Sequence, residues 1–132
     1  MKALRLLMII YSIGLIMVGL LSLTIPEQIM KLFGFDELPD STRTTLFLLA
    51  GIYIAAGFWA IISAKNTVSN LVWIKLLLTK ASFSIVIFIY LAIQSYANMG
   101  TPGAVSTMVI DLVFIILTLV FYPWRVRQQV TR

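Results

Sequence analysis

Two charged residues, Asp111 and Lys80, lie inside long apolar stretches of this sequence. The apolar residues that follow Asp111, residues 112–122, are too few to cross a bilayer alone, so the carboxylate cannot lie outside it. At about 1.5 Å per helical residue, Asp111 lies roughly 16 Å from the nearer membrane surface. The same arithmetic places Lys80 roughly 10 Å inside that surface, about 6 Å from the depth of Asp111.

A charge alone at this depth costs at least about 2.5–3.5 kcal/mol, and a partner of opposite charge lowers that cost. We therefore predict an ion pair between Asp111 and Lys80, with the hydroxyls of Thr79, Ser84 and Thr107 near it. Two interpretations follow from the pair. It fixes the register and orientation of two helices, or it lines a polar cavity for a proton, an ion or a small ligand.

Three further residues are candidates for the same site. Arg43, near the outer end of its apolar stretch, competes with Lys80 as the partner of Asp111. Lys75 lies a turn and a half closer to the surface, where a long side chain can reach toward water. Tyr53 lies in the second apolar stretch, although anchoring at the membrane interface is the usual role of a membrane tyrosine.

Other chemistry is excluded by the residue types that are missing. The sequence has no Cys and no His, so it lacks thiolate and imidazole metal ligands, bis-histidine haem sites, disulfide relays and Ser-His or Cys-His nucleophiles. The acidic residues 36–40 lack the ligand spacing of a calcium loop. We therefore expect no metal and no cofactor, and we favour a protein that is not an enzyme.

The elements that carry these residues follow from the composition. The chain has 132 residues, of which 61% are hydrophobic and 11% charged, which is typical of a membrane protein and not of a soluble domain. A helix needs roughly 20 apolar residues to cross a bilayer. Four stretches, residues 6–25, 45–64, 71–96 and 104–122, reach this length. The prediction is an all-α chain, a single four-span transmembrane domain over residues 1–132, folded as an up-down four-helix bundle.

The start of the chain, with Lys2 and Arg5 before an apolar run, also resembles a signal peptide. Residues 23–26 lack a small-residue cleavage site, so we expect the first span to be retained. Basic residues then gather on the side of both termini: Lys2, Arg5, Lys65, Arg125, Arg127 and Arg132. The positive-inside rule places both termini in the cytoplasm. The formal charge of +5 is thus a topology signal, and we expect no nucleic-acid partner.

A short helix is predicted between the first two spans, over residues 26–35. Pro26 suits a first helical turn, Glu27 complements the positive end of the helix dipole, and Gly34 suits a cap with positive φ. Its apolar side favours a position in the membrane interface, either as a connector or as a lid over a cavity.

Small and polar residues indicate which helix faces meet, because lipid provides no hydrophobic force between helices. Such stripes are Ser12, Leu15, Gly19 and Ser22 in the first span, Ala50, Tyr53, Gly57, Ala60 and Ala64 in the second, and Thr107, Asp111, Thr118 and Tyr122 in the fourth. The third span has two polar strips, and the pattern does not choose between them. They are Lys75, Thr79 and Ser82, and Lys80 with Ser84.

Two features of the layout point to a family. The first span is followed by Pro26, a short apolar and acidic segment and Gly34-Phe35, and Arg43 opens a second span that contains Ala-Gly-Ile-Tyr-Ile-Ala-Ala-Gly at residues 50–57. In this the chain resembles the small four-helix membrane proteins grouped as DoxX-like or BphX-like. The resemblance implies a bacterial or archaeal cytoplasmic (inner) membrane protein. It also implies a basic residue in the third span and an acid in the last, which Lys80 and Asp111 match.

The function that these observations favour is a non-enzymatic integral membrane protein, either an accessory subunit of a larger membrane complex or a bundle that binds a small ligand. The alternative is a small proton- or ion-coupled transporter that uses Asp111 and Lys80, and that forms a homodimer because four helices enclose little room. A third interpretation, an enzyme that handles a quinone or a lipid, requires an apolar slot beside the charges that opens to lipid.

Overall fold

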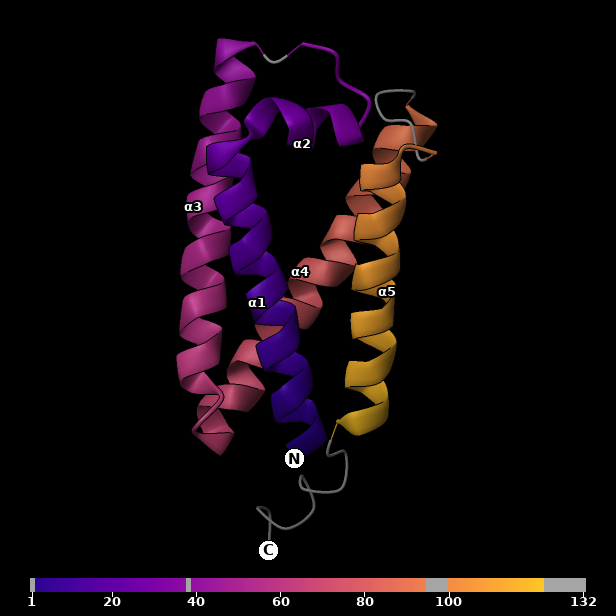
Figure 1. Ribbon diagram of the computed structural model, residues 1–132. Coiled ribbons are helices and arrows are strands. Elements are labelled where there is room, and N and C mark those ends of the chain that lie inside the picture. Colours follow the sequence, from indigo (N-terminus) through magenta and orange to yellow (C-terminus); the bar gives the residue numbers. More distant parts are fainter. Residues whose placement is uncertain (1, 38, 95–99, 123–132) are drawn as a thin grey trace, which may run out of the picture.

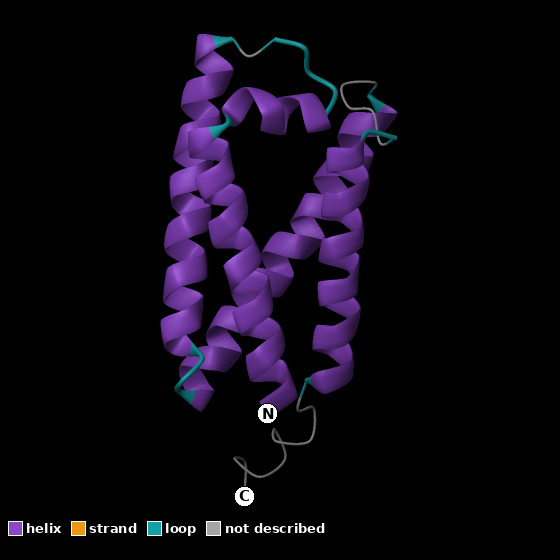
Figure 2. Cartoon of the chain, in the orientation of Figure 1, coloured by secondary structure: helices purple, strands orange, loops and turns teal. Residues whose placement is uncertain are grey.

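The computed structural model describes residues 2–37, 39–94 and 100–122, and the regular structure in these ranges is helical (Figures 1 and 2). The helices are α1 (Lys2–Thr24), α2 (Pro26–Leu32), α3 (Asp40–Ser63), α4 (Thr67–Ile93) and α5 (Pro102–Phe121). All except α2 are long and apolar enough to cross a membrane. The all-helical class and the four candidate spans predicted from the sequence are thereby confirmed.

Each long helix begins a few residues before its predicted apolar stretch, because polar residues continue the helix beyond the apolar part. Helix α3 begins at Asp40 instead of residue 45, and this acid in the first turn complements the helix dipole. Helix α5 begins at Pro102, and the side chain of Thr101 caps it by accepting a hydrogen bond from the Ala104 N–H at 3.4 Å. Residues 95–99 and 123–132, with the tail arginines, lie outside the described ranges.

Helix α2 ends in a Schellman motif. The Phe35 N–H donates to the Met30 carbonyl at 3.1 Å, and the Gly34 N–H donates to the Lys31 carbonyl at 3.0 Å. Gly34 has a φ of 86°, the left-handed conformation predicted for it and one that costs glycine little. The chain leaves the helical conformation at Ile25, between α1 and α2, and the short helix lies across one end of the long helices (Figure 1).

Helices α1 and α3 form the most extensive contact in the fold. A Cβ atom added at Gly19 would lie 2.8 Å from the Ala50 carbonyl oxygen, and one added at Gly57 would lie 2.7 Å from the Ser12 carbonyl oxygen. The two glycines therefore let the backbones approach closely at two levels of the interface, as small residues do between membrane helices.

The second pair of helices is α4 and α5. Helix α4 starts beside the end of α3 and runs obliquely to the start of α5, which it packs against (Figure 1). The contacts that join this pair to α1 and α3 are fewer, so the two pairs diverge toward the end that α2 covers. The outer faces of the long helices expose large apolar side chains, for example Val72, Ile93 and Val120, as a lipid environment requires.

Candidate functional site: a polar cluster below an apolar cavity

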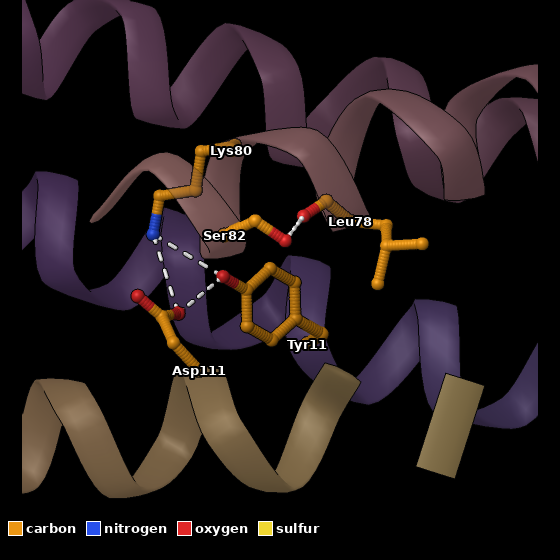
Figure 3. Close-up of polar contacts among 5 residues, drawn as sticks. All are labelled: Tyr11, Leu78, Lys80, Ser82 and Asp111. Atoms are coloured by element: carbon orange, nitrogen blue, oxygen red, sulfur yellow. Dashed lines mark hydrogen bonds and ion pairs between the residues drawn. The ribbon is translucent and has the colours of Figure 1, made fainter. Parts of the chain in front are cut away.

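Three polar side chains from three helices meet near the middle of the molecule (Figure 3). The Tyr11 hydroxyl of α1 donates to Oδ1 of Asp111 on α5 at 2.6 Å. The Lys80 ammonium of α4 donates to the Tyr11 hydroxyl oxygen at 3.2 Å and lies 3.5 Å from the same Oδ1. The structure thus brings Asp111 and Lys80 together, and Tyr11 bridges them.

Aromatic rings hold this cluster in place. The Lys80 Nζ lies 5.6 Å from the ring centroid of Tyr11 and 5.3 Å from that of Tyr53, which is within the range of a cation–π interaction. The Tyr11 ring in turn stacks on Phe114, with centroids 3.9 Å apart and planes at 19°. These contacts keep the ammonium near aromatic faces, which replace part of the hydration that it loses in the membrane.

The two oxygens of the Asp111 carboxylate differ in their partners. Oδ1 accepts from both Tyr11 and Lys80, whereas Oδ2 is buried and has no hydrogen-bond partner among the described residues. Asp111 is only 2% exposed, while the side chain of Lys80 is 28% exposed. A buried acceptor without a donor costs about 1–3 kcal/mol and more for a charged group, so Oδ2 is an unsatisfied position of the site.

The sequence analysis missed Tyr11, although a signal for it was present. Tyr11 lies nine residues after Lys2, and Asp111 lies ten residues before Phe121, so each is roughly 14–15 Å from the same end of its helix. Matching depths place the phenol and the carboxylate side by side once α1 and α5 are neighbours. Interfacial anchoring is the usual role of a membrane tyrosine, and the depth of Tyr11 is the signal that distinguishes it from such an anchor.

A cavity of about 1480 Å³ lies between the two helix pairs, and all five helices or their ends contribute to its walls. The cluster of Tyr11, Lys80 and Asp111 lines the cavity on the side away from α2, and Met30 and Phe33 line the end below α2. Phe33 stacks on Phe88 of α4, with ring centroids 6.2 Å apart, so this end is covered by aromatic groups. Pockets for small ligands commonly have volumes of about 300–1000 Å³, and this cavity is larger.

On the other side of the cluster the molecule is filled. Leu4, Met8, Ile74, Leu77 and Phe114 are each at most 3% exposed and form the apolar core there. The cavity lies mainly in the half of the molecule that α2 covers, and its lining continues past the polar cluster to Leu7, Phe114 and Leu117 beside this core.

The other predicted site residues have mixed outcomes. Ser84 and Thr107 line the cavity, as does Tyr53.

Thr79, which was expected near the ion pair, does not lie there. It is exposed, and its hydroxyl donates to the Lys75 carbonyl of its own helix at 2.8 Å. The reason is helical geometry, because Thr79 precedes Lys80 by one residue and so points about 100° away from it. Lys75 is exposed on the same outer strip.

Arg43 is not the partner of Asp111. Its guanidinium forms an ion pair with Glu27 at 3.1 Å, which ties the start of α3 to α2. Both side chains are largely exposed, so this pair contributes at most about 1 kcal/mol to stability. The competition between Arg43 and Lys80 that the sequence left open is thus decided for Lys80 in the structure.

These features define the chain as a helical protein with four candidate membrane spans and a polar cluster buried among them. The chain matches no protein-family model, no curated protein and no solved structure. Its resemblance to DoxX-like and BphX-like proteins therefore stays a prediction.

Proposed function

We propose that this protein is a multi-pass membrane protein that binds a small lipophilic molecule in the cavity above Asp111 and Lys80. In this proposal the four long helices cross the bilayer in an up-down arrangement with both termini in the cytoplasm. Helix α2 then lies in the opposite membrane interface and covers the ligand. The excess of basic residues on the side of the termini supports this orientation.

The observation that carries the proposal is the combination of a mostly apolar wall with one pair of charged groups. Most residues that line the cavity are aliphatic or aromatic, and the charged ones among them are Lys80 and Asp111. Ligand sites commonly have this composition, with a few polar groups that fix the orientation of an apolar molecule. Ionisable residues inside a membrane also raise the expectation of function.

Transport of a proton or an ion is the second candidate, and the packing below the cluster argues against it. A conducting path would have to continue from Asp111 toward the end of the molecule that carries Lys2. That half is filled by buried apolar side chains such as Met8 and Leu77. The lining of the cavity stops at Leu7 and Leu117, short of the helix ends at Lys2 and Phe121, so a binding site fits this packing better than a path through the molecule.

A pair of glycine substitutions tests the proposal. Gly14 lines the cavity and Gly51 does not, and a Cβ added at either meets no atom within 4 Å. Gly14→Leu therefore adds a side chain to the cavity wall at a position where its Cβ meets no atom, while Gly51→Leu adds the same side chain elsewhere. The wild-type protein and both variants are purified from their host membrane, and native mass spectrometry counts the bound small molecules.

We expect a bound lipophilic molecule on the wild-type protein and on Gly51→Leu, with at least about tenfold lower occupancy on Gly14→Leu. Equal occupancy of all three proteins, or no bound molecule on any of them, would contradict the proposal.

A further inference from the structure

Resting on the proposed function, we infer that the ligand is an uncharged lipid alcohol, whose hydroxyl binds between Asp111 and Lys80 while its hydrocarbon part fills the cavity. The inference follows from the hydrogen-bonding positions that the cluster leaves open, from its charge balance and from the side on which the cavity opens.

The Asp111 side of the site requires a donor. A carboxylate accepts hydrogen bonds and has none to donate. Its Oδ1 already accepts from Tyr11 and Lys80, while the buried Oδ2 has no partner among the described residues. In Figure 3 this oxygen points away from the Tyr11 ring, and Asp111 lines the cavity. A ligand group that reaches Oδ2 from the cavity must therefore carry a hydrogen that it can donate.

The Lys80 side of the site requires an acceptor. An ammonium has three N–H donors, and Tyr11 and Asp111 occupy two of them. Lys80 also lines the cavity, where its side chain is partly exposed. One oxygen that donates to Asp111 and accepts from Lys80 satisfies both positions, and a hydroxyl group is the simplest group that does so.

The charges of the cluster favour a neutral ligand. Lys80 and Asp111 carry one positive and one negative charge 3.5 Å apart, and they are the charged residues that line the cavity in the described part of the chain. A cationic head would add an unbalanced positive charge beside Lys80, and an anionic head would add a negative one beside Asp111. Either adds an unpaired charge in a low-dielectric region, which is costly.

The cavity also opens toward the bilayer, which indicates where the hydrocarbon part comes from. Ile10 and Val18 of α1 and Ile110 and Val113 of α5 line the cavity and are exposed at the same time. Exposed lining residues of α1 and α5 thus connect the cavity with the outer surface of the helices. A molecule dissolved in the membrane can enter there, with its apolar part in contact mostly with apolar side chains.

The test compares four probes with the same hydrocarbon chain and different heads: 1-hexadecanol, hexadecane, hexadecanoate and hexadecylammonium. Each is added at equal amounts to nanodiscs that contain the full chain, and native mass spectrometry of the released protein gives the occupancy. We expect 1-hexadecanol to bind at least about tenfold more tightly than the other three, because a hydrogen bond to a charged group contributes about that factor. The variants are Gly14→Leu, Gly51→Leu and the double substitution Lys80→Met with Asp111→Leu.

The double substitution separates this inference from the proposed function. It removes both charges at once and keeps the volume similar, a change that proteins commonly tolerate. We expect it to bind 1-hexadecanol and hexadecane equally well. A preference for the alcohol that survives the double substitution, or no preference in the wild-type protein, would overturn the inference. If Gly14→Leu instead bound all four probes as well as the wild-type protein does, the proposed cavity site would be overturned.

Discussion

At the scale of single residues, the site depends on how Tyr11 divides its hydroxyl between two charges. The hydroxyl donates to Asp111 and accepts from Lys80, so it lies between an ammonium and a carboxylate that are themselves 3.5 Å apart. Hydrogen bonds to ionised groups are stronger than those between neutral groups, and burial strengthens them further. The phenol therefore stabilises the pair and directs both donors to Oδ1, which leaves Oδ2 open.

Tyr11→Phe removes this bridge while keeping the ring that stacks on Phe114. We expect the free energy of unfolding to fall by about 1–3 kcal/mol, because both charges lose a hydrogen bond in a buried site. Tyr53→Phe is the matched control, since it keeps the ring that faces Lys80. The measurement is unfolding in a detergent titration, and an unchanged stability for Tyr11→Phe would contradict the bridging role.

The ion pair itself is tested by a double-mutant cycle. Lys80→Met leaves Asp111 without its cation, and Asp111→Leu leaves Lys80 without its anion, so each single change is expected to destabilise by about 3–5 kcal/mol. The double substitution removes both charges and is expected to be more stable than either single variant. Additive effects of the two substitutions in the same detergent titration would mean that the two residues do not interact.

Much of this arrangement follows from depth alone. Counting residues from the ends of the apolar stretches put Asp111 and Lys80 at similar heights, and the structure places them 3.5 Å apart. The same counting would have found Tyr11. Thr79 shows the limit of the method, because depth says nothing about which way a side chain points around the helix, and Thr79 points outward.

At the scale of helices, close backbone contact organises α1 and α3. Ser12, Leu15, Gly19 and Ser22 were expected on one contact stripe, and all four are buried. Small residues predict such interfaces well, because only they let two helices approach closely. For α4 the sequence offered two polar strips, and burial of Ile74, Leu77 and Ala81 turns Lys80 and Ser84 inward. The sequence pattern could not show which strip of α4 faces the other helices, because each strip carries a lysine and at least one hydroxyl.

Gly57→Ala is the prediction at this scale. The added Cβ would lie 2.7 Å from the Ser12 carbonyl oxygen, which is backbone, so α1 and α3 must separate. We expect a loss of about 1–3 kcal/mol, as for other overpacked positions. Gly51→Ala meets no atom within 4 Å and is expected to be neutral or to stabilise by up to about 1 kcal/mol. Thermal unfolding of both variants in detergent distinguishes these outcomes, and equal melting temperatures would contradict the close contact.

At the scale of the whole molecule, the proposed orientation in the membrane sets the side on which α2 covers the cavity. The chain has no cysteine, so single cysteines report on sidedness. We expect Asp36→Cys, between α2 and α3, to react with a membrane-impermeant maleimide on intact cells. Asn66→Cys, between α3 and α4, should react only after the membrane is permeabilised. The reverse pattern would invert the molecule and place α2 at the cytoplasmic interface.

The cavity is the feature of the whole molecule that the sequence could not supply. Its volume results from the oblique course of α4 and from the divergence of the two helix pairs, which short motifs do not encode. The sequence does allow two parts of this feature to be predicted. A polar cavity is one of the two interpretations of the ion pair, and a lid is one interpretation of residues 26–35. The central proposal is therefore that a lipophilic molecule occupies this cavity.

The most direct measurement is photolabelling in the native membrane with a hexadecanol that carries a diazirine near its hydroxyl, followed by mass spectrometry of the labelled positions. We predict labels on cavity residues such as Ala50, Ser84 and Thr107 that disappear when excess unlabelled 1-hexadecanol is added. Labels on outward-facing residues such as Val72 and Val120 should persist, because bulk lipid is not saturable. Labelling confined to the outward-facing residues would show that the cavity holds no such molecule and would contradict the account.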